Sequence, residues 1–558
     1  MRENLLVFDG QRSADAEVVK LLRASGDGDV KAREVPAGGT SVSGILHVRR
    51  TLTSAVVDAR LRAMCDLMVA EAREYAGLHD YDGEVQDLSD AGVRRDVARL
   101  GGTRLADAHD EAHLSAFEDW ARATFIEAEE HRRNPLLHAG NLDLAGYDRE
   151  YAPADQRADA RRRHLAKWPD AIDTSVRALD QVSAPVARGL LRAVQGLGAA
   201  IDGDGMDDEI ATAARVAHGR LVDHIQHCAD TGDPDPALGG QLLARLMGSI
   251  EGVPVDLGRL AARADAERDR LRALLADACA RLEPDTDAAD VVAGLLHDHP
   301  DAEGVLTEAR AQTDEVIAFT VERNLVPGLD GECRVGPAPP SRRWAMAMMS
   351  PAAPFEDDGP SWYHVTPPDP AWPEHEQEQW LQVFSRTTLP VITAHEVAPG
   401  HFAHGRVLRR MATDVRRALH SPAFVEGWAH YTEELCVEEG FRAGDPRFAV
   451  GMALEALVRV TRLAVAIGVH TRAMTMEEAE HRFEHDAHLE GPAARSEAAR
   501  ATFDPTYGRY TWGKLEIVAL RAEAQARWGT KYSHARFHEA LLGLGSPPLG
   551  LMGAVLGE

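Results

Sequence analysis

The sequence predicts a mainly α-helical protein that folds as two lobes and carries one small β-sheet. Alanine, arginine, leucine, aspartate and glutamate dominate the 558 residues, and aromatic residues make up only 6% of them. Such a composition favours helix over strand. Apolar residues also recur at three- and four-residue spacing, which is the period of an amphipathic helix. A chain of this length usually forms two connected lobes rather than one very large core.

The first lobe is expected to span residues 1–335. Residues 1–50 show little periodicity and indicate a partly ordered lead-in, whereas the chain from about residue 54 to 330 is repeatedly helical. Clusters of Gly, Asp and Pro, such as residues 230–236, mark turns between the helices. Five segments carry the helical pattern: Ser54–Tyr75, Ser175–Leu197, Asp207–Cys228, Leu257–Leu282 and Gly304–Arg323.

The second lobe is expected to span residues 336–558 and to begin with the sheet. Pro-rich turns flank two segments, residues 343–349 and 361–366, which are the best strand candidates in the chain. A short sheet at this position could bind an extended peptide by main-chain pairing.

The helical pattern returns after Pro373 and continues almost to the C-terminus. Pro390 is expected to start one helix, and Pro422 lies where the first turn of another would be, a position that proline favours. Thr475 with Glu478 is typical of a capping box that opens a further helix.

Charge and cysteine content restrict the class of protein. The formal net charge of −28 argues against nucleic-acid binding, because phosphate neutralisation needs a basic surface. The five cysteines are scattered and include no Cys-x-x-Cys pair, which suits a reducing compartment. We find no signal-peptide pattern at the N-terminus and no run of 18 apolar residues. The expectation is a cytoplasmic protein that binds neither nucleic acid nor membrane.

Two short segments carry the residues of a catalytic zinc site. The first, residues 393–404, reads Thr-Ala-His-Glu-Val-Ala-Pro-Gly-His-Phe-Ala-His and contains His395, Glu396 and His401. The second, twenty-five residues beyond His401, begins with Glu426 and reads Glu-Gly-Trp-Ala-His-Tyr. Two imidazoles and one carboxylate can hold Zn²⁺ and leave a position open for water. The glutamate beside the first histidine can then take that water's proton.

The spacing of the two histidines requires a break in the helix. His395 and His401 are six residues apart, which on an ideal helix means about 9 Å of rise and about 120° of rotation, so they could not share one metal. Pro399 and Gly400 lie between them. Proline cannot donate to the carbonyl four residues back, and glycine permits unusual backbone angles. We therefore predict a two-residue bulge that returns both histidines to one face.

The ordered motifs resemble a bacterial family catalogued as domain of unknown function 885, whose members are predicted to be gluzincin-like zinc metallopeptidases. The resemblance covers roughly residues 340–530 and includes two further segments: Arg462 to His470, and Tyr510-Thr-Trp-Gly-Lys514. It implies a two-lobed helical zinc-metallopeptidase-like fold with the small sheet beside the active-site helix. It also implies metal ligands and a general base, which are His395, His401 and Glu426 for the metal and Glu396 for the base.

The chain departs from the family pattern at several positions. Phe402 stands where the family usually has a second histidine, Ala466 replaces an aspartate, and His430 replaces an apolar residue. The spacing before Tyr510 is also shortened. These changes leave the predicted metal ligands intact but bear on substrate recognition.

Further residues are candidates for supporting roles. Glu433 and His430 lie on the same helical face as Glu426 and could orient a ligand, although Glu433 could equally form a structural salt bridge and His430 could itself reach the metal. His404 is an alternative ligand or, more simply, a supporting or exposed residue.

Three residues are candidates for contact with the substrate. Tyr510 and His470 could hydrogen-bond the oxyanion of a tetrahedral intermediate, and either could instead be a satisfied core residue. Arg462 lies on a largely apolar helix and could hold a ligand carboxylate or a substrate C-terminus.

The function expected from the sequence is a zinc-dependent hydrolase that cleaves an amide (peptide) bond with metal-activated water. Its partner would be a peptide or a small amide. One alternative is a metal-dependent amidase or lyase that acts on a small metabolite in a biosynthetic pathway. Another is a catalytically silent, metal-binding helical protein, against which the presence of Glu396 argues. Substrate identity and length, endo- or exo-cleavage and oligomeric state remain open.

Overall fold

The computed structural model describes residues 3–8, 44–49 and 58–557, except 202–207 and 358, and divides into the units Met1–Ala59 and Arg60–Glu558. In the first unit, strand β1 (Glu3–Phe8) pairs antiparallel with β2 (Gly44–Arg49), and Glu3 lies opposite Arg49. We predicted no regular element in this region, and the two strands correct that expectation. Their pairing joins segments far apart in sequence, which local periodicity does not reveal.

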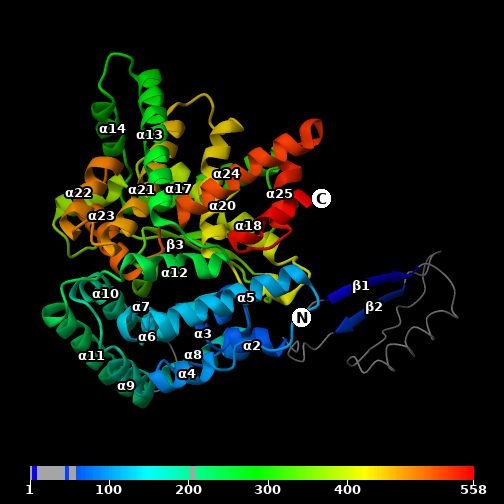
Figure 1. Ribbon diagram of the computed structural model, residues 1–558, viewed down its shortest axis with the longest axis vertical. Coiled ribbons are helices and arrows are strands. Elements are labelled where there is room, and N and C mark those ends of the chain that lie inside the picture. The colour runs from blue at the N-terminus through cyan, green and yellow to red at the C-terminus, as the bar shows by residue number, and fades with distance from the viewer. Residues whose placement is uncertain (1–2, 9–43, 50–57, 202–207, 358, 558) are drawn as a thin grey trace. The chain divides into compact units, whose positions relative to one another are not determined.

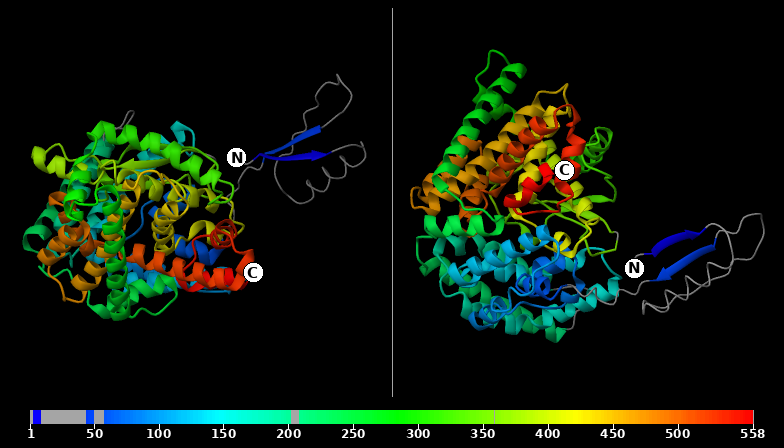
Figure 2. Two further views of the ribbon diagram at one scale, coloured as in Figure 1. Left: turned by 90° about the horizontal axis from the view of Figure 1, so that it is seen from above. Right: turned by 45° about the vertical axis from the view of Figure 1, so that its right-hand side comes forward.

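The second unit begins with a group of helices that lie together in Figure 1 and in the right-hand view of Figure 2. These are α2 (Ala59–Cys65), α3 (Val69–Glu71), α4 (Asp90–Val97), α5 (Ala108–Arg122), α6 (Glu130–Arg133), α7 (Pro135–Leu142), α8 (Ala154–Ala166), α9 (Trp168–Ala178), α10 (Ala184–Gly196) and α11 (Asp208–Thr231).

Four helices and a three-stranded sheet follow. The helices are α12 (Gly240–Glu251), α13 (Leu257–Leu282), α14 (Ala288–His297) and α15 (Ala302–Glu322). The strands are β3 (Cys333–Pro337), β4 (Ala347–Ser350) and β5 (Ser361–Val365). β5 lies in the centre of this sheet, parallel to β3 and antiparallel to β4.

The rest of the chain is helical. The helices are α16 (Glu374–Gln382), α17 (Leu389–Glu396), α18 (His401–Leu408), α19 (Asp414–Ala418), α20 (Pro422–Glu438), α21 (Arg447–His470), α22 (Met476–Ala487), α23 (Gly491–Phe503), α24 (Arg509–Trp528) and α25 (His534–Leu542). The described residues contain no helix long and apolar enough to cross a membrane.

Side-chain caps explain where many helices begin. Short polar side chains accept a hydrogen bond from an N–H of the first turn, which satisfies a donor that has no partner inside the helix. Thr475 and Glu478 form the predicted capping box of α22. Other caps are Asp256 on α13, Asp287 on α14, Asp301 on α15 and Ser421 on α20.

The periodicity locates some elements better than others. The predicted segment Leu257–Leu282 coincides with α13, and Pro422 is the first residue of α20. The predicted segment Ser175–Leu197 is instead two helices, because α9 ends at Ala178 and α10 begins at Ala184. Strand β3 was not predicted; it is short and pairs in parallel with a segment almost thirty residues further along the chain.

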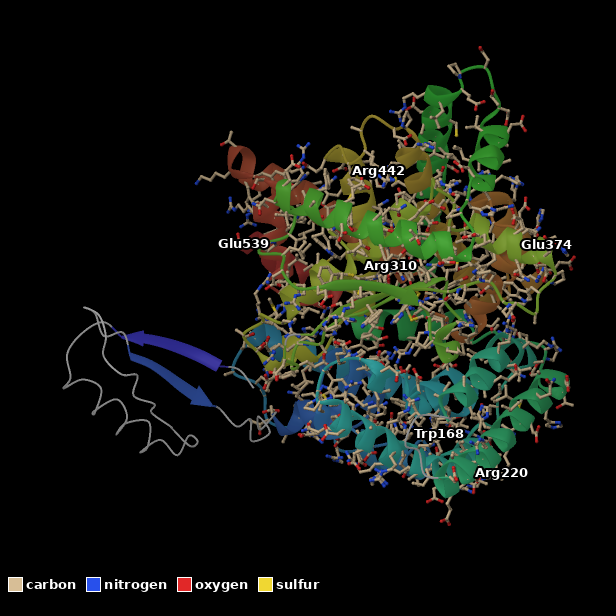
Figure 3. The ribbon with its side chains drawn as sticks, turned by 180° about the vertical axis from the view of Figure 1, so that it is seen from behind. Trp168, Arg220, Arg310, Glu374, Arg442 and Glu539 are labelled. Carbon is tan, nitrogen blue, oxygen red and sulfur yellow. The ribbon has the colours of Figure 1, made fainter. Side chains whose placement is uncertain are left out.

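The described residues of the second unit form several apolar clusters, of which two contain the most buried residues and serve as its cores; the division between these two differs from the predicted lobes. One core contains residues between Ala139 and Ala229 together with Phe503. The other runs from Leu243 to Val555, so α12–α15 share it with the sheet and the later helices. Figure 3 shows Trp168 and Arg220 in the first group, and Arg442 and Glu539 in the second. The predicted boundary at 335/336 therefore does not separate the cores; the division falls near residue 235, where the Asp- and Pro-rich turn lies.

Helix α17 lies inside the second core. All eight of its residues are buried, and it packs against α15, α20, α21 and β4. In Figure 1, α17, α20 and α21 lie close together in the part of the molecule that α13 and α24 flank. A polar side chain on α17 is therefore held in place from several sides.

Candidate metal centre

The helix that carries the first motif is interrupted where the sequence predicted a bulge. α17 ends at Glu396, and α18 begins at His401 after a cis peptide bond between Ala398 and Pro399. Gly400 packs so closely that a Cβ atom at this position would overlap the carbonyl oxygen of His395. The indole of Trp428 donates a hydrogen bond to the carbonyl of Pro399 at 2.9 Å. The predicted departure from regular helix is confirmed.

The interruption brings the two histidines together. The ring centroids of His395 and His401 are 4.7 Å apart, and the rings are nearly perpendicular. Glu426 approaches from the neighbouring helix α20, and one ligand atom from each of the three residues lies within 4.8 Å of the others. Among the residues that the structure describes, this is the group of three or more His, Cys, Asp or Glu side chains that could hold a metal ion.

The distances among these atoms fit a metal ion between them. Glu426 Oε2 lies 3.6 Å from His395 Nε2 and 3.2 Å from His401 Nε2. Ligands about 2.0–2.1 Å from a tetrahedral zinc are separated by about 3.3 Å, which is close to both values. The same oxygen of Glu426 is buried and has no hydrogen-bond partner among the described residues.

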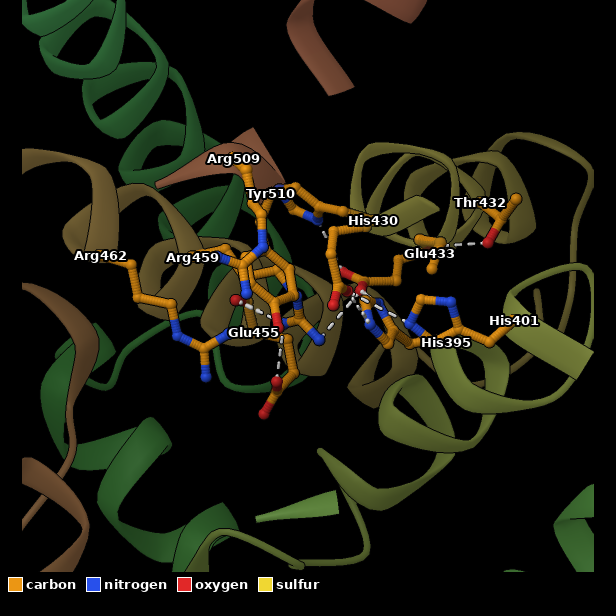
Figure 4. A network of polar contacts seen from close by, with 12 residues as sticks. His395, His401, His430, Thr432, Glu433, Glu455, Arg459, Arg462, Arg509 and Tyr510 are labelled. Atoms are coloured by element: carbon orange, nitrogen blue, oxygen red, sulfur yellow. Dashed lines mark hydrogen bonds and ion pairs between the residues drawn. The ribbon is translucent and has the colours of Figure 1, made fainter. Parts of the chain in front are cut away.

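Glu433 fixes the orientation of His395. It follows Glu426 by two turns of α20, and its Oε1 accepts from His395 Nδ1 at 2.6 Å. It also accepts from His430 Nδ1 at 3.0 Å and lies 3.1 Å from the guanidinium of Arg459 (Figure 4). Burial is the largest single cause and raises the pKa of Glu433, but the charge of Arg459 and the contacts with His430 and His395 together outweigh it and hold this pKa well below its usual range. A carboxylate behind a ligand histidine is the usual support of a metal site.

This hydrogen bond determines which nitrogen of His395 is free. An ionised Glu433 accepts only, so His395 must donate its Nδ1 proton to it. A neutral His395 then presents a lone pair at Nε2, directed at the carboxylate of Glu426. Two lone pairs at this distance repel each other unless a cation lies between them. The donor set therefore fits a metal ion or, failing that, an extra proton.

Glu396 lies beside this group with spare hydrogen-bonding capacity. The residue is 5% exposed, and its Oε2 is buried without a hydrogen-bond partner among the described residues. Burial is the largest cause that raises the pKa of its carboxyl, to about 7, and the nearby imidazole of His401 opposes the rise. The side chains of His401 and Glu426 are more exposed than that of His395. Solvent therefore reaches the three-residue group from the side of His401 and Glu426.

Tyr510 stacks on the ring of His395. The two rings are 6.2 Å apart at 20°, and the tyrosine hydroxyl accepts from Arg500 at 3.2 Å. Tyr510 comes from α24, which approaches α20 so closely that a Cβ on Gly427 would lie 2.5 Å from the backbone of Gly513. This glycine contact brings the helix of Glu426 and the helix of Tyr510 together.

The structure corrects the expectation for His470. Its Nε2 bonds the carbonyl of Ala501 at 2.9 Å, and its Nδ1 accepts from the backbone N–H of Leu238 at 3.3 Å. It lies eleven residues after Arg459 on α21, which is about 16 Å of helix. Its ring has no free nitrogen for a substrate, so His470 joins two backbone segments instead.

Arg462 is also occupied within the protein. It makes two hydrogen bonds of 2.6 Å to the carboxylate of Glu497, and its guanidinium lies over the ring of Tyr510 at 4.8 Å. The expectation that it binds a substrate carboxylate is therefore replaced by a role in holding α21 against α23 and Tyr510 in place.

The remaining candidates from the sequence also differ in whether their polar groups have partners within the protein. His404 Nε2 lies 3.2 Å from the hydroxyl of Ser546, outside the three-residue group, and burial lowers its pKa to about 3. His430 bonds Glu433 and leaves its buried Nε2 without a partner among the described residues. Lys514 forms ion pairs with Glu267 and Glu434 at 3.0 and 2.7 Å.

The residue that sequence reasoning missed is Arg459. It lies one turn before Arg462 on α21, is 5% exposed, and pairs with Glu433 and Glu455. A second arginine in an apolar helix is a signal, since a buried charge needs a partner. Its partner on another helix could not be deduced from spacing.

Comparison with known proteins shows the family. Residues 71–556 match the family described as "Bacterial protein of unknown function (DUF885)", and the chain belongs to that family. No curated protein matches.

Two solved structures share the fold. One is titled as a "putative lipoprotein of unknown function" from Shewanella oneidensis; it is 20% identical, with a TM-score of 0.69 over 90% of this chain and 98% of that one. The other is titled as a "putative lipoprotein" from Colwellia psychrerythraea; it is 15% identical, with a TM-score of 0.71 over 89% of this chain and 96% of that one. At these identities the likeness concerns the fold alone.

Proposed function

We propose that the protein is a zinc-dependent hydrolase that cleaves an amide bond in a peptide. The observation that carries the proposal is the arrangement of His395 between two carboxylates. Its Nδ1 donates to Glu433, and its Nε2 faces Glu426 across 3.6 Å. In a histidine with a purely structural role, the nitrogen that carries the proton donates to an acceptor and the other nitrogen accepts from a donor, as in His470.

The donor set supports zinc among the common metals. Two imidazoles and one carboxylate are typical of catalytic zinc, whereas calcium and magnesium prefer sets composed of oxygen. A bound zinc ion would supply a water molecule of lowered pKa and polarise the substrate carbonyl. His395, His401 and Glu426 would hold the ion, and Glu433 would keep the first of them in the required tautomer.

Glu396 is the residue proposed to move the proton. It directly follows His395, and its partnerless Oε2 can accept a proton from water on the exposed side of the group. The same carboxyl can then pass the proton to the leaving amine, which completes the hydrolysis of an amide. Its burial keeps competing bulk water away from the carboxylate.

Tyr510 is proposed to stabilise the oxyanion. Its oxygen accepts the hydrogen bond from Arg500, so its own proton remains available for donation. A phenol beside a carbonyl that gains negative charge can stabilise it by such a bond. The stacking on His395 holds the ring at the edge of the group.

The sheet supports a peptide as substrate. β4 is an edge strand that pairs with β5 on one side and packs against α17. Its other edge has no strand partner among the described residues. An extended peptide could add to such an edge by main-chain hydrogen bonds.

The test is cleavage of a mixed peptide library by the zinc-loaded protein, followed by mass spectrometry of the products. We expect new N-termini to appear, to vanish after chelation, and to return when zinc is added. Absence of any metal-dependent cleavage across the library, in protein shown to carry one zinc per chain, would contradict the proposal.

A further inference from the structure

A pocket lined by arginines and tryptophans lies outside the metal centre. Its volume is about 570 Å³, which is in the range of small-ligand sites. It lies between α10, the turn before β4, the segment after β5, and α23. The charged and aromatic residues that line it are Arg188, Arg192, Arg343, Arg495, Asp369, Trp344, Trp372 and Trp380.

The charge of this pocket is opposite to that of the chain. Asp and Glu outnumber Lys and Arg by 89 to 61 in the whole sequence, yet four arginines and one aspartate line the pocket. Arg192 pairs with Asp369, and Arg495 pairs with Glu376 at 2.7 Å. The pocket therefore carries a local positive charge on an acidic protein.

Two of the arginines have no acidic partner among the residues that the structure describes. Arg343 donates only to the carbonyl of Ala338, at 3.1 Å, and Arg188 makes no ion pair there. The charge of Arg343 also lowers the pKa of Arg192, after the larger effect of burial. Guanidinium groups that repel one another around a cavity favour the binding of an anion.

The aromatic wall is fixed in position. The guanidinium of Arg192 lies 5.2 Å from the ring of Trp372, whose centroid is 5.4 Å from that of Trp380. The indole of Trp380 donates to the carbonyl of Thr366 at 3.0 Å. A rigid apolar surface beside guanidinium groups without acidic partners suits a ligand that carries both carboxylates and apolar groups.

The sheet connects this pocket with the metal centre. Burial is the main cause that raises the pKa of Tyr363 on β5, and the charge of Glu396 adds to the rise, so the two side chains lie near each other. Thr366 lines the pocket three residues further along, which corresponds to about 10 Å of extended chain. β4 runs beside this stretch and pairs Met349 with Tyr363 and Ala347 with Val365.

A second series of contacts leads to the same place. Trp344 of the pocket lies 5.5 Å from the guanidinium of Arg500. Arg500 bonds the hydroxyl of Tyr510, whose ring stacks on His395. Two independent series of contacts therefore connect the pocket with the metal centre.

We propose that this pocket binds carboxylate groups of an extended substrate, about three residues away from the bond held at the metal centre. The position relative to the cleaved bond rests on the proposed function, whereas binding of the acidic chain does not. Arg188 and Arg343 determine the specificity for carboxylates. Neither guanidinium group is paired with an acidic side chain among the described residues, so both can bind a ligand without breaking an ion pair.

The test is a binding measurement on the full chain carrying Glu396→Gln, so that turnover does not consume the probe. The probes are fluorescein-labelled hexapeptide amides with three alanines and three glutamates in either order, and their glutamine counterparts. Fluorescence anisotropy should show at least about tenfold tighter binding of a glutamate peptide than of its glutamine counterpart, because charge-assisted bonds to guanidinium are strong. Labelled hexa-alanine as free acid and as amide separates a terminal carboxylate from side-chain carboxylates.

The variant Arg188→Gln/Arg343→Gln should lose the glutamate preference. Arg177→Gln/Arg259→Gln is the matched control, since it removes the same charge from exposed arginines outside the pocket and should keep the preference. Equal binding of glutamate and glutamine peptides, or a preference that survives in the pocket variant, overturns the inference. Either result leaves the hydrolase proposal to its own test. Acidic peptides that bind the zinc-loaded wild-type protein through the pocket but are never cleaved by it would keep the pocket and overturn its position relative to the cleaved bond.

Discussion

Two buried histidines, His395 and His470, were selected by motif in the same way, but their surroundings differ. His470 has both ring nitrogens bonded to backbone groups, an N–H of Leu238 and a carbonyl of Ala501. His395 has one nitrogen bonded to Glu433 and the other directed at the carboxylate of Glu426. The first ring has both nitrogens satisfied within the protein, whereas the second has a nitrogen that a metal ion or an extra proton would satisfy. Motif spacing finds candidate residues, and hydrogen-bond accounting separates ligands from structural residues.

The buried carboxylates differ in the same way: some have partners within the protein, whereas Glu396 has an oxygen without a partner among the described residues. We therefore expect the largest effect on activity from a substitution of Glu396. Glu396→Gln removes the proton acceptor and keeps nearly the same shape, so the zinc content should be unchanged. The rate of peptide cleavage should fall by about 10²–10⁴. Steady-state kinetics of the zinc-loaded variant checks this, and wild-type kcat in that variant would show that Glu396 is not the general base.

Glu497 is the matched carboxylate whose partner lies within the protein. Glu497→Gln would leave the buried guanidinium of Arg462 without compensation, which typically costs about 3–5 kcal/mol of unfolding free energy. Zinc binding should persist in the folded variant. Urea unfolding measures the loss, with the exposed Glu523→Gln as control. A loss no larger than that of the control would show that the ion pair does not stabilise the fold.

Glu433 should have a smaller effect than either of these two, because it touches the metal centre only through His395. The amide oxygen of Glu433→Gln can still accept a hydrogen bond from Nδ1 of His395, but the variant lacks the negative charge that fixes this tautomer and loses the ion pair with Arg459. Zinc affinity should weaken by about 10–100-fold with little change in zinc stoichiometry at saturation. Competition with a chromophoric chelator measures the affinity, and an unchanged value would remove Glu433 from the metal centre.

The smallest expected effect concerns His138, which resembles His470 because both of its ring nitrogens are hydrogen-bonded within the protein. His138 bonds Ser175 and the carbonyl of His131, and burial lowers its pKa from 6.5 to about 4. The unfolded chain therefore binds this proton more readily than the folded one. The stability that it contributes is complete above about pH 6.5 and is lost as the pH falls towards about 4, with a slope of at most about 1.4 kcal/mol per pH unit.

His138→Gln should reduce the slope of the unfolding free energy against pH in this range. The reduction should be at most about 1.4 kcal/mol per pH unit, which corresponds to one proton. His481, which is 79% exposed, provides the control, since His481→Gln should leave the profile unchanged. Urea unfolding at pH values between 4 and 7 supplies the profile. An equal slope in wild type and His138→Gln would contradict the assignment.

Much of the site and part of the fold follow from local sequence, for identifiable reasons. The interruption of the helix at Pro399 and Gly400 was predictable, although as a bulge rather than a break between two helices, because proline cannot continue the helical hydrogen bonds and glycine permits unusual backbone angles. Helix α13 was predictable because its apolar residues repeat over seven turns. Glu433 was found because it lies two turns from Glu426 on one helix.

What could not be predicted depends on contacts between distant segments. β3 pairs with β5 across a long connection, and Arg459 meets Glu433 from a different helix. His470 was assigned to the substrate because nothing in its own segment shows that Leu238 and Ala501 bond its ring. The boundary predicted at 335/336 does not coincide with the division between the two cores, because core membership is a property of packing and not of composition.

The most direct test of the central claim is the zinc content of the purified protein by elemental analysis, compared between His401→Ala and His470→Gln. We predict one zinc per chain in wild type, none in the first variant and one in the folded second variant. Stoichiometric zinc in His401→Ala, or wild-type protein that binds no zinc when it is supplied, would contradict the metal centre and with it the distinction between the two histidines.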